Sequence, residues 1–209
     1  MKKAIIGLVS VLGLAALGFV GVVSMQPSEL DVARSVTIDA APQDVAVWMV
    51  DLKKVNAWSP WNELDPDMAM TFSETTGQIG SSYSWEGNDE VGAGSSTIAS
   101  IAPGAVTHNL RFLRPMESEA LITLSWAESE AGKTSVTWGM KAQNDFMGKA
   151  AGLFMDMDEL VGADFARGLG LLVPLAEKTR EERVAAEEAA RLAAAEAEAA
   201  AEGEEAAMP

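Results

Sequence analysis

Hydrophobic and polar residues alternate through the middle of the chain, which indicates a series of β-strands. The alternation runs from Met68 to Gln143, and turn residues such as Pro103-Gly104 interrupt it. Because successive side chains of a strand point to opposite faces, each run predicts a strand with one buried face. The short turns between runs predict an antiparallel meander. The six runs cover residues 68–72, 81–85, 97–101, 106–112, 122–126 and 136–140.

Short elements precede this strand region. Residues 36–38 alternate and predict a short strand. Pro42 suits the first turn of a helix, and apolar residues at helical spacing follow it. Residues 56–61 predict a second short helical turn or a loop, which ends near Pro60.

A long helix is expected after the strands. Apolar positions from Phe146 to Leu172 form one continuous stripe at helical spacing. We expect a break or bend near Gly162 and a kink or an end at Pro174. The apolar stripe must be buried, and the sheet is the available partner.

Residues 1–25 contain a long apolar run. Two lysines precede an uncharged segment from Ala4 to Met25, and acidic residues follow it. About 20 helical residues cross a hydrocarbon layer roughly 30 Å thick, so we predict a signal anchor that spans the membrane as an N-terminal transmembrane helix. The positive-inside rule makes this a single-pass inner membrane protein with a cytoplasmic N-terminus and a periplasmic domain. A cleaved export signal and a buried helix of a soluble protein are the alternatives.

The C-terminal segment differs in composition from the rest. Residues 179–209 are almost entirely alanine and glutamate with a few arginines. These are good helix formers, but bulky apolar residues are scarce, so we predict a solvated helical or disordered tail. With residues 26–32 interpreted as a linker, residues 33–178 remain as one folded domain.

Composition excludes several kinds of chemistry. The formal net charge of −16 argues against nucleic acid as a partner. Cysteine is absent, which excludes disulfides and thiolate chemistry. The single histidine, His108, cannot supply the usual ligands of a zinc site. We therefore expect neither a metal nor a cofactor.

Several local motifs resemble one known superfamily. They occupy residues 38–45, 58–61, 80–87, 92–94, 136–138 and 162–169. In these motifs and in its order of elements the chain resembles the SRPBCC superfamily of polyketide cyclase and START-like proteins, as a membrane-anchored bacterial member. The resemblance implies an α+β helix-grip fold, in which a curved antiparallel sheet wraps around a long C-terminal helix. It also implies a deep apolar cavity between the sheet and that helix.

The inward-facing positions supply the candidate site. His108 alternates with apolar residues, so it is either a polar anchor or acid/base group for a ligand, or a histidine satisfied by a neighbouring group. The tryptophans either pack in the core or line an entrance, and Trp58 and Trp61 are the best entrance candidates because they lie between elements. The residues expected to line the cavity are Trp58, Trp61, Tyr83, Trp85, His108, Phe112, Trp138 and Met140.

Two functions fit this pattern. The first is a membrane-tethered, non-catalytic domain that binds a lipid-like or other apolar small molecule. The alternative is a polyketide cyclase- or dehydratase-like enzyme that uses the same cavity. Catalysis needs a positioned acid or base, and His108, Tyr83, Arg111 and Glu86 form no recognisable constellation. A structural or partner-binding role, through the tail, remains a third possibility.

Overall fold

The sheet of this protein is a single antiparallel layer. The computed structural model describes residues 2–206 of the 209-residue chain, with side chains described for residue 10 and residues 12–200. Its seven strands follow the order β1-β7-β6-β5-β4-β3-β2, so the predicted six-stranded meander is confirmed and β1 pairs with its last strand. The strands are β1 (Glu29–Ile38), β2 (Ala69–Phe72), β3 (Ser82–Glu86), β4 (Ala93–Ala102), β5 (Ala105–Arg114), β6 (Ser118–Glu130) and β7 (Lys133–Gln143).

Strand β1 is longer than the sequence suggested. It begins at Glu29, inside the segment expected to be a linker, and pairs with β7 from Glu29↔Gln143 to Ile38↔Thr134. Val32 is fully buried, while the acidic residues beside it are exposed. The start of the folded domain therefore lies before residue 33.

Three short helical elements connect β1 to β2. They are α2 (Pro42–Ala46), α3 (Leu52–Asn56) and the 3₁₀ helix η1 (Pro60–Glu63). Proline occupies the first turn of α2 and of η1, where its missing N–H costs no hydrogen bond. The Asp51 side chain caps α3 by accepting hydrogen bonds from the backbone N–H groups of Lys53 and Lys54.

The C-terminal helical region is divided at a different place from the predicted one. Helix α4 (Phe146–Ala151) ends before a turn at residues 152–156, and α5 then runs without interruption from Met157 to Ala206. Helix α5 neither breaks at Gly162 nor ends at Pro174, because both residues lie within it. The alternatives, a bend near Gly162 and a kink at Pro174, stay predictions.

Two glycines of α5 allow close approach instead. The Arg34 side chain passes over Gly162 to reach Asp158, and a Cβ at Gly162 would lie 2.0 Å from its Nη2. A Cβ at Gly168 would lie 2.7 Å from the Trp138 ring and 3.1 Å from Pro60. These positions therefore let α5 pack closely on the sheet and on η1.

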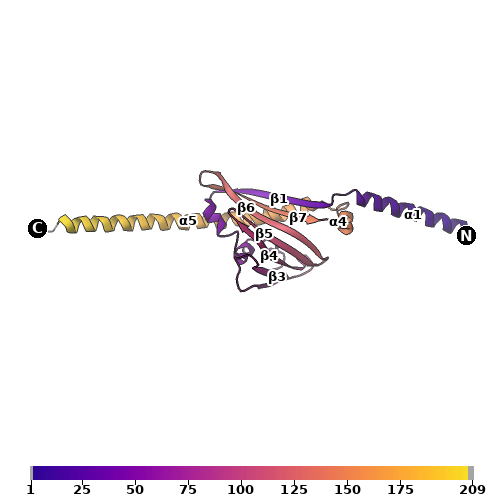
Figure 1. Cartoon of the computed structure of the whole chain (residues 1–209), viewed down its shortest axis with the longest axis horizontal. Coiled ribbons are helices and arrows are strands. Elements are labelled where there is room, and N and C mark those ends of the chain that lie inside the picture. The colour runs from indigo at the N-terminus through magenta and orange to yellow at the C-terminus, as the bar shows by residue number, and fades with distance from the viewer. Residues whose placement is uncertain (1, 207–209) are drawn as a thin grey trace.

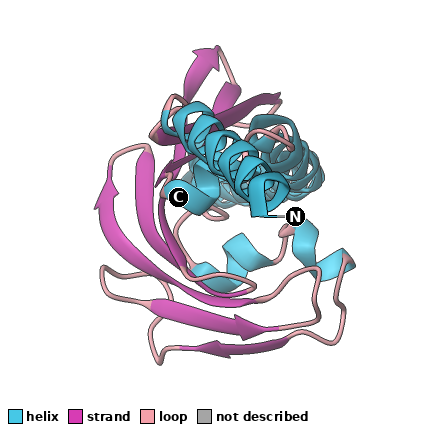
Figure 2. Cartoon of the chain, turned by 90° about the vertical axis from the view of Figure 1, so that its right-hand side faces the viewer, coloured by secondary structure: helices cyan, strands magenta, loops and turns pink. Residues whose placement is uncertain are grey.

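The sheet curves around the helices, and α5 covers only part of it. Figure 2 shows the strands wrapped about α5 and the short helices. Helix α5 packs mainly on β1 and touches β7 and η1 at fewer points. Phe165, Leu169 and Leu172 of α5 join the core. The α+β helix-grip architecture is thus confirmed.

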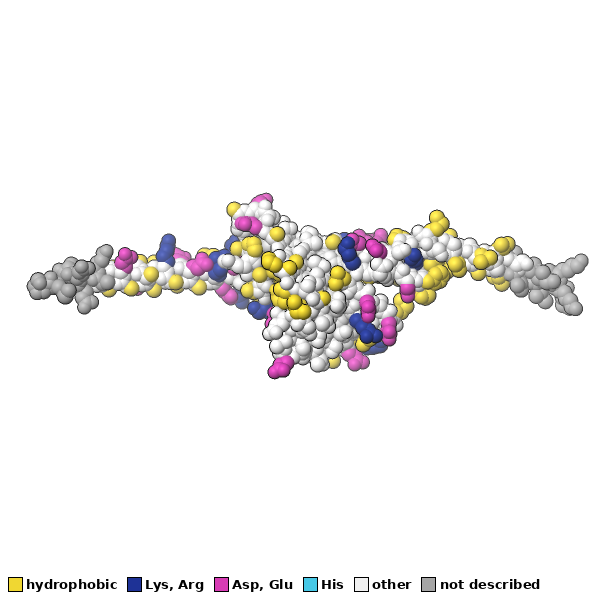
Figure 3. Space-filling view, viewed as in Figure 1, with side chains coloured by type: hydrophobic (Ala, Val, Ile, Leu, Met, Phe, Trp, Pro, Cys, Tyr) yellow, Lys and Arg dark blue, Asp and Glu magenta, His cyan; other side chains and the backbone are white. Residues whose placement is uncertain are grey.

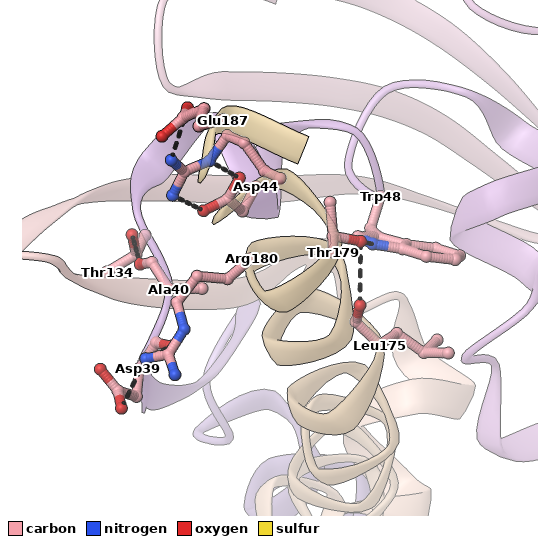
Figure 4. Close-up of polar contacts among 10 residues, drawn as sticks. Asp39, Ala40, Asp44, Trp48, Thr134, Leu175, Thr179, Arg180 and Glu187 are labelled. Carbon is pink, nitrogen blue, oxygen red and sulfur yellow. Dashed lines mark hydrogen bonds and ion pairs between the residues drawn. The ribbon is translucent and has the colours of Figure 1, made fainter. Parts of the chain in front are cut away.

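Beyond the sheet, two arginines fasten α5 to α2 and to Asp39, the residue after β1 (Figure 4). Arg183 donates to both carboxylate oxygens of Asp44, at 2.7 and 2.9 Å, although Asp44 is only 2% exposed. Arg180 pairs with Asp39 at 2.8 Å. The Arg183 guanidinium holds the pKa of Asp44 below its usual range. We call these two pairs the arginine clamp.

The clamp lies inside the segment that was expected to be a free tail. Trp48 also donates its indole N–H to Thr179 at 3.0 Å, so the helix is docked past residue 178. From Val184 to residue 200 the side chains of α5 are exposed. The exposed extension therefore begins a little more than one turn after the predicted residue 179, and Figure 1 shows it projecting from the domain.

Helix α1 (Lys2–Ser24) projects from the opposite end of the molecule (Figure 1). Among the residues that the structure describes, no helix combines the length and the apolar character needed to cross a membrane. Residues 1–9 and 11 of the predicted anchor lie outside those with described side chains.

Candidate functional site

The concave face of the sheet has a closed interior. Neighbouring strands place five side chains in one row across it, and all five are at least nine-tenths buried. The pairings Val32↔Met140, Met140↔Ile122, Ile122↔His108 and His108↔Ile98 define this inner row. The predicted site residues Met140 and His108 are therefore interior residues.

The next row toward the start of β1 is much more open. Its apolar members are half-buried, and only Ser96 is fully buried. The register runs Leu30↔Ala142, Ala142↔Ala120, Ala120↔Leu110, Leu110↔Ser96, Ser96↔Tyr83 and Tyr83↔Phe72. We call this end of the concave face, which adjoins α1, the open end, and the end at the arginine clamp the closed end.

Aromatic rings line the open end. The ring centroids of Phe72 and Tyr83, Tyr83 and Trp85, and Trp85 and Phe112 lie 5.6, 5.8 and 5.8 Å apart. All four rings are half-buried, and together they form a continuous apolar wall on β2, β3 and β5. Gly94 makes room for this wall, because a Cβ there would lie 2.5 Å from the Trp85 ring. Aromatic rings offer a large apolar area, so covering them with an apolar molecule is favourable.

The other predicted tryptophans pack together away from this wall. Trp138 stacks on Phe165 of α5 with centroids 4.3 Å apart, and meets Trp58 and Trp61 edge to face at 5.1 and 5.6 Å. Trp58 is fully buried and donates its indole N–H to the Trp48 carbonyl at 3.1 Å. Trp58 therefore does not occupy the expected entrance position, because its side chain belongs to the core and has no exposed surface. Trp61 is half-buried at the edge of the same cluster.

His108 lies in the inner row with one polar neighbour. Its Nδ1 is 3.2 Å from Ser96 Oγ, and its Nε2 has no hydrogen-bond partner among the described residues. The side chain is only 3% exposed, and burial lowers its pKa to about 4. His108 is therefore neutral at physiological pH. Burial also raises the pKa of Tyr83 to about 12, so its phenol stays protonated.

The other polar residues considered in the sequence do not join His108 in the interior. Arg111 and Glu86 are exposed, and each makes an ion pair with another exposed side chain. No group of three or more potential metal-ligating side chains occurs among the described residues. The Nε1 atom of Trp138 is also buried and has no hydrogen-bond partner within the part of the chain whose side chains are described. The interior thus contains single polar atoms, His108 Nε2 and Trp138 Nε1, surrounded by apolar side chains.

Two hollows of about 510 Å³ each open at the surface. One lies at the closed end beside Arg180 and Arg183, whose charges are already paired with carboxylates. The other lies at the open end and includes Leu30, Phe154 and Met155. Neither hollow is lined by the predicted residues Trp138, Met140, Phe112 and His108.

Sequence reasoning missed part of the open end. Leu30 was assigned to a linker, and Phe72, Leu110 and Ala120 were not singled out. The alternation along each strand showed that Phe72 and Leu110 face inward, but nothing in it showed where α5 leaves the sheet uncovered.

Comparison with solved structures identifies the fold. The Mll3558 protein from Rhizobium loti is 18% identical over 70% of this chain and 96% of its own, with a TM-score of 0.53. Protein CV1439 from Chromobacterium violaceum is 14% identical over 72% and 98%, with a TM-score of 0.51. The di-domain ARO/CYC StfQ from the steffimycin biosynthetic pathway is 11% identical over 72% and 51%, with a TM-score of 0.52.

These likenesses confirm the helix-grip fold that the motifs predicted. No family model matches the sequence, and no curated protein matches it. At such low identity the solved structures establish the architecture, and function must be argued from the site.

Proposed function

We propose that this protein binds an apolar small molecule at the open end of its concave face and is held at a membrane by its N-terminal helix. One observation carries the binding proposal: four aromatic rings line the sheet where α5 does not cover it, and all four remain half-exposed. Large apolar side chains gathered in a concave surface favour a ligand with matching apolar area.

The chemistry of the interior supports binding rather than turnover. His108 is neutral, its only hydrogen-bond partner among the described residues is Ser96, and its Nε2 is unpaired. A general acid or base works best with a pKa near the working pH, and about 4 is far below it. A ligand bearing one polar group could use such an atom as an anchor. The likeness to StfQ makes a cyclase-like reaction the alternative to exclude.

The tether is supported by the side chains of α1. The segment from Ala4 to Met25 is uncharged. Leu12, Leu14, Leu17 and Phe19 are exposed, so the helix carries apolar area that no side chain of the described residues covers. Lipid is the partner that removes such area from water, with the domain on the periplasmic side.

Native mass spectrometry of the full-length protein tests the binding proposal. The protein is purified with its membrane, moved into lipid nanodiscs and released in the spectrometer, where we expect one apolar molecule per chain. Ala120→Trp fills the open end and should remove that molecule. Ala127→Trp is the matched control, because Ala127 lies on β6 at an exposed position of the opposite face.

The two variants separate the possible results. Loss of the adduct in Ala120→Trp alone supports a ligand at the open end. An adduct that survives in both variants, or its absence from the parent chain, contradicts the proposal. A time-dependent chemical change of the bound molecule that stops in His108→Gln would favour the enzymatic alternative.

A further inference from the structure

Exposed apolar side chains gather where α1 meets the domain. Figure 3 shows hydrophobic atoms near the base of α1. Five large ones belong to α4, the following turn and the first turn of α5, and their exposed fractions run from 46% to 79%. We call them the apolar collar: Phe146, Met147, Phe154, Met155 and Leu160. Single exposed apolar residues are ordinary, but a group of this size on one short segment marks an interaction surface.

The collar is fixed in position beside α1. Val23, near the end of α1, is fully buried, and α1 contacts α4. The backbone N–H of Asn144 donates to Ser28 at 2.8 Å, and Lys149 donates to the Ser28 hydroxyl at 3.1 Å. These hydrogen bonds join the segment after α1 to the segment that carries α4. The collar is therefore held close to α1.

We propose that the apolar collar rests on the lipid bilayer into which α1 inserts, so that the open end of the concave face is turned toward the membrane. This proposal rests on the tether proposed above. The exposed apolar surface of α1 is continuous with the collar, because α4 packs against the base of that helix. A bilayer that accepts α1 therefore meets the collar without any rearrangement.

The charges of the chain indicate an apolar contact rather than an electrostatic one. The net charge is −16, and Asp145 and Asp156 flank the collar, while Asp158 is paired with Arg34 and Lys149 donates to Ser28. An anionic lipid surface would repel these carboxylates, so burial of apolar area must supply the attraction. Phosphatidylcholine, which is neutral overall, is therefore a suitable test lipid, and salt should have little effect.

The absence of cysteine permits a clean test with single fluorescent labels. Full-length chains carrying Val20→Cys, Phe154→Cys or Ile79→Cys are labelled with an environment-sensitive dye and reconstituted into phosphatidylcholine vesicles. Ile79 is the matched control, because it is 66% exposed and lies in the β2–β3 connection, far from α1 along the strands. A lipid-attached quencher placed near the bilayer surface reports contact.

We expect the labels at Val20 and Phe154 to shift to shorter wavelength and to lose emission to the quencher, while the label at Ile79 stays unchanged at low and high salt. Quenching at Val20 without quenching at Phe154 would overturn the collar proposal and leave the tether intact. Absence of quenching at Val20 would overturn the tether itself. A wavelength shift at Phe154 that depends on protein concentration and not on lipid would assign the collar to a second copy of the chain, and would equally refute the proposal.

Discussion

The two ends of the concave face belong to one sheet but differ in how far their side chains are buried. At the closed end, the inner row is buried, α5 lies over β1, and the arginine clamp ties α5 to α2 and to the residue after β1. At the open end the same alternation continues, yet Tyr83, Trp85 and Phe112 are only half-covered. The difference comes from the path of α5, which packs mainly on β1 and touches β7 at fewer points.

This comparison separates residues that hold the fold from residues that are available to a ligand. A side chain of the closed end contributes packing energy in the free protein. A side chain of the open end contributes its full apolar area only when something covers it. Stability and binding should therefore respond to different substitutions.

The largest expected effect distinguishes two tryptophans. Trp58→Ala removes a fully buried ring and should lower the free energy of unfolding by about 3–5 kcal/mol. Trp85→Ala removes a half-exposed ring, so it should cost much less stability and instead remove the bound molecule. Denaturant unfolding and native mass spectrometry of both variants check this, and equal losses of stability would erase the distinction between the two ends.

The clamp provides the next largest effect. Removing residues 181–209 deletes Arg183 and leaves the Asp44 carboxylate buried without its partner, which should lower the melting temperature by roughly 10 °C. Removing residues 188–209 keeps the clamp and should change the melting temperature by no more than about 2 °C. Thermal unfolding in one detergent compares both chains. Equal melting temperatures of the two chains would show that the clamp does not stabilise the folded domain.

The free energy of unfolding should depend on pH because the His108 imidazole is buried in the inner row. Its pKa falls from 6.5 to about 4 on folding, so the unfolded chain binds the proton more tightly. The stabilisation is complete above pH 6.5 and is lost progressively as the pH falls toward 4, by about 3 kcal/mol in total. His108→Gln should lose this part of the dependence. Parallel denaturation curves for both proteins from pH 7 to pH 4 would contradict the burial of a neutral imidazole.

Much of the fold could be predicted because alternation and turn residues are local signals. Strands β2 to β7 follow from them directly. The start of β1 was missed because Pro27 and the acidic residues after it resemble a linker. The break before α5 did have a signal: Asp156 accepts a hydrogen bond from the Glu159 backbone, and this Asp-x-x-Glu spacing is typical of a helix start.

The sequence predicted which side of the sheet carries the candidate site. It did not predict which positions on that side stay uncovered. Alternation put His108, Tyr83, Trp138 and Met140 on the same side of the sheet, and the structure agrees. Whether each is buried depends on where α5 crosses, which is a tertiary property. The docking of Arg183 on Asp44 was likewise invisible, because residues 139 positions apart share no local pattern.

The smallest expected effect concerns two leucines on opposite faces of the sheet. Leu110 is half-buried at the open end, while Leu121 on β6 is 41% exposed on the convex face. Leu110→Ala should cost about 1 kcal/mol, and Leu121→Ala less than about 0.5 kcal/mol, because only the first loses packing against the core. An apolar ligand that binds the folded state raises its melting temperature, and this rise should shrink in Leu110→Ala and persist in Leu121→Ala. Thermal unfolding with and without the ligand recovered from the native protein measures both effects. An equal ligand-induced rise in the melting temperature of both variants would show that the ligand does not bind at the open end.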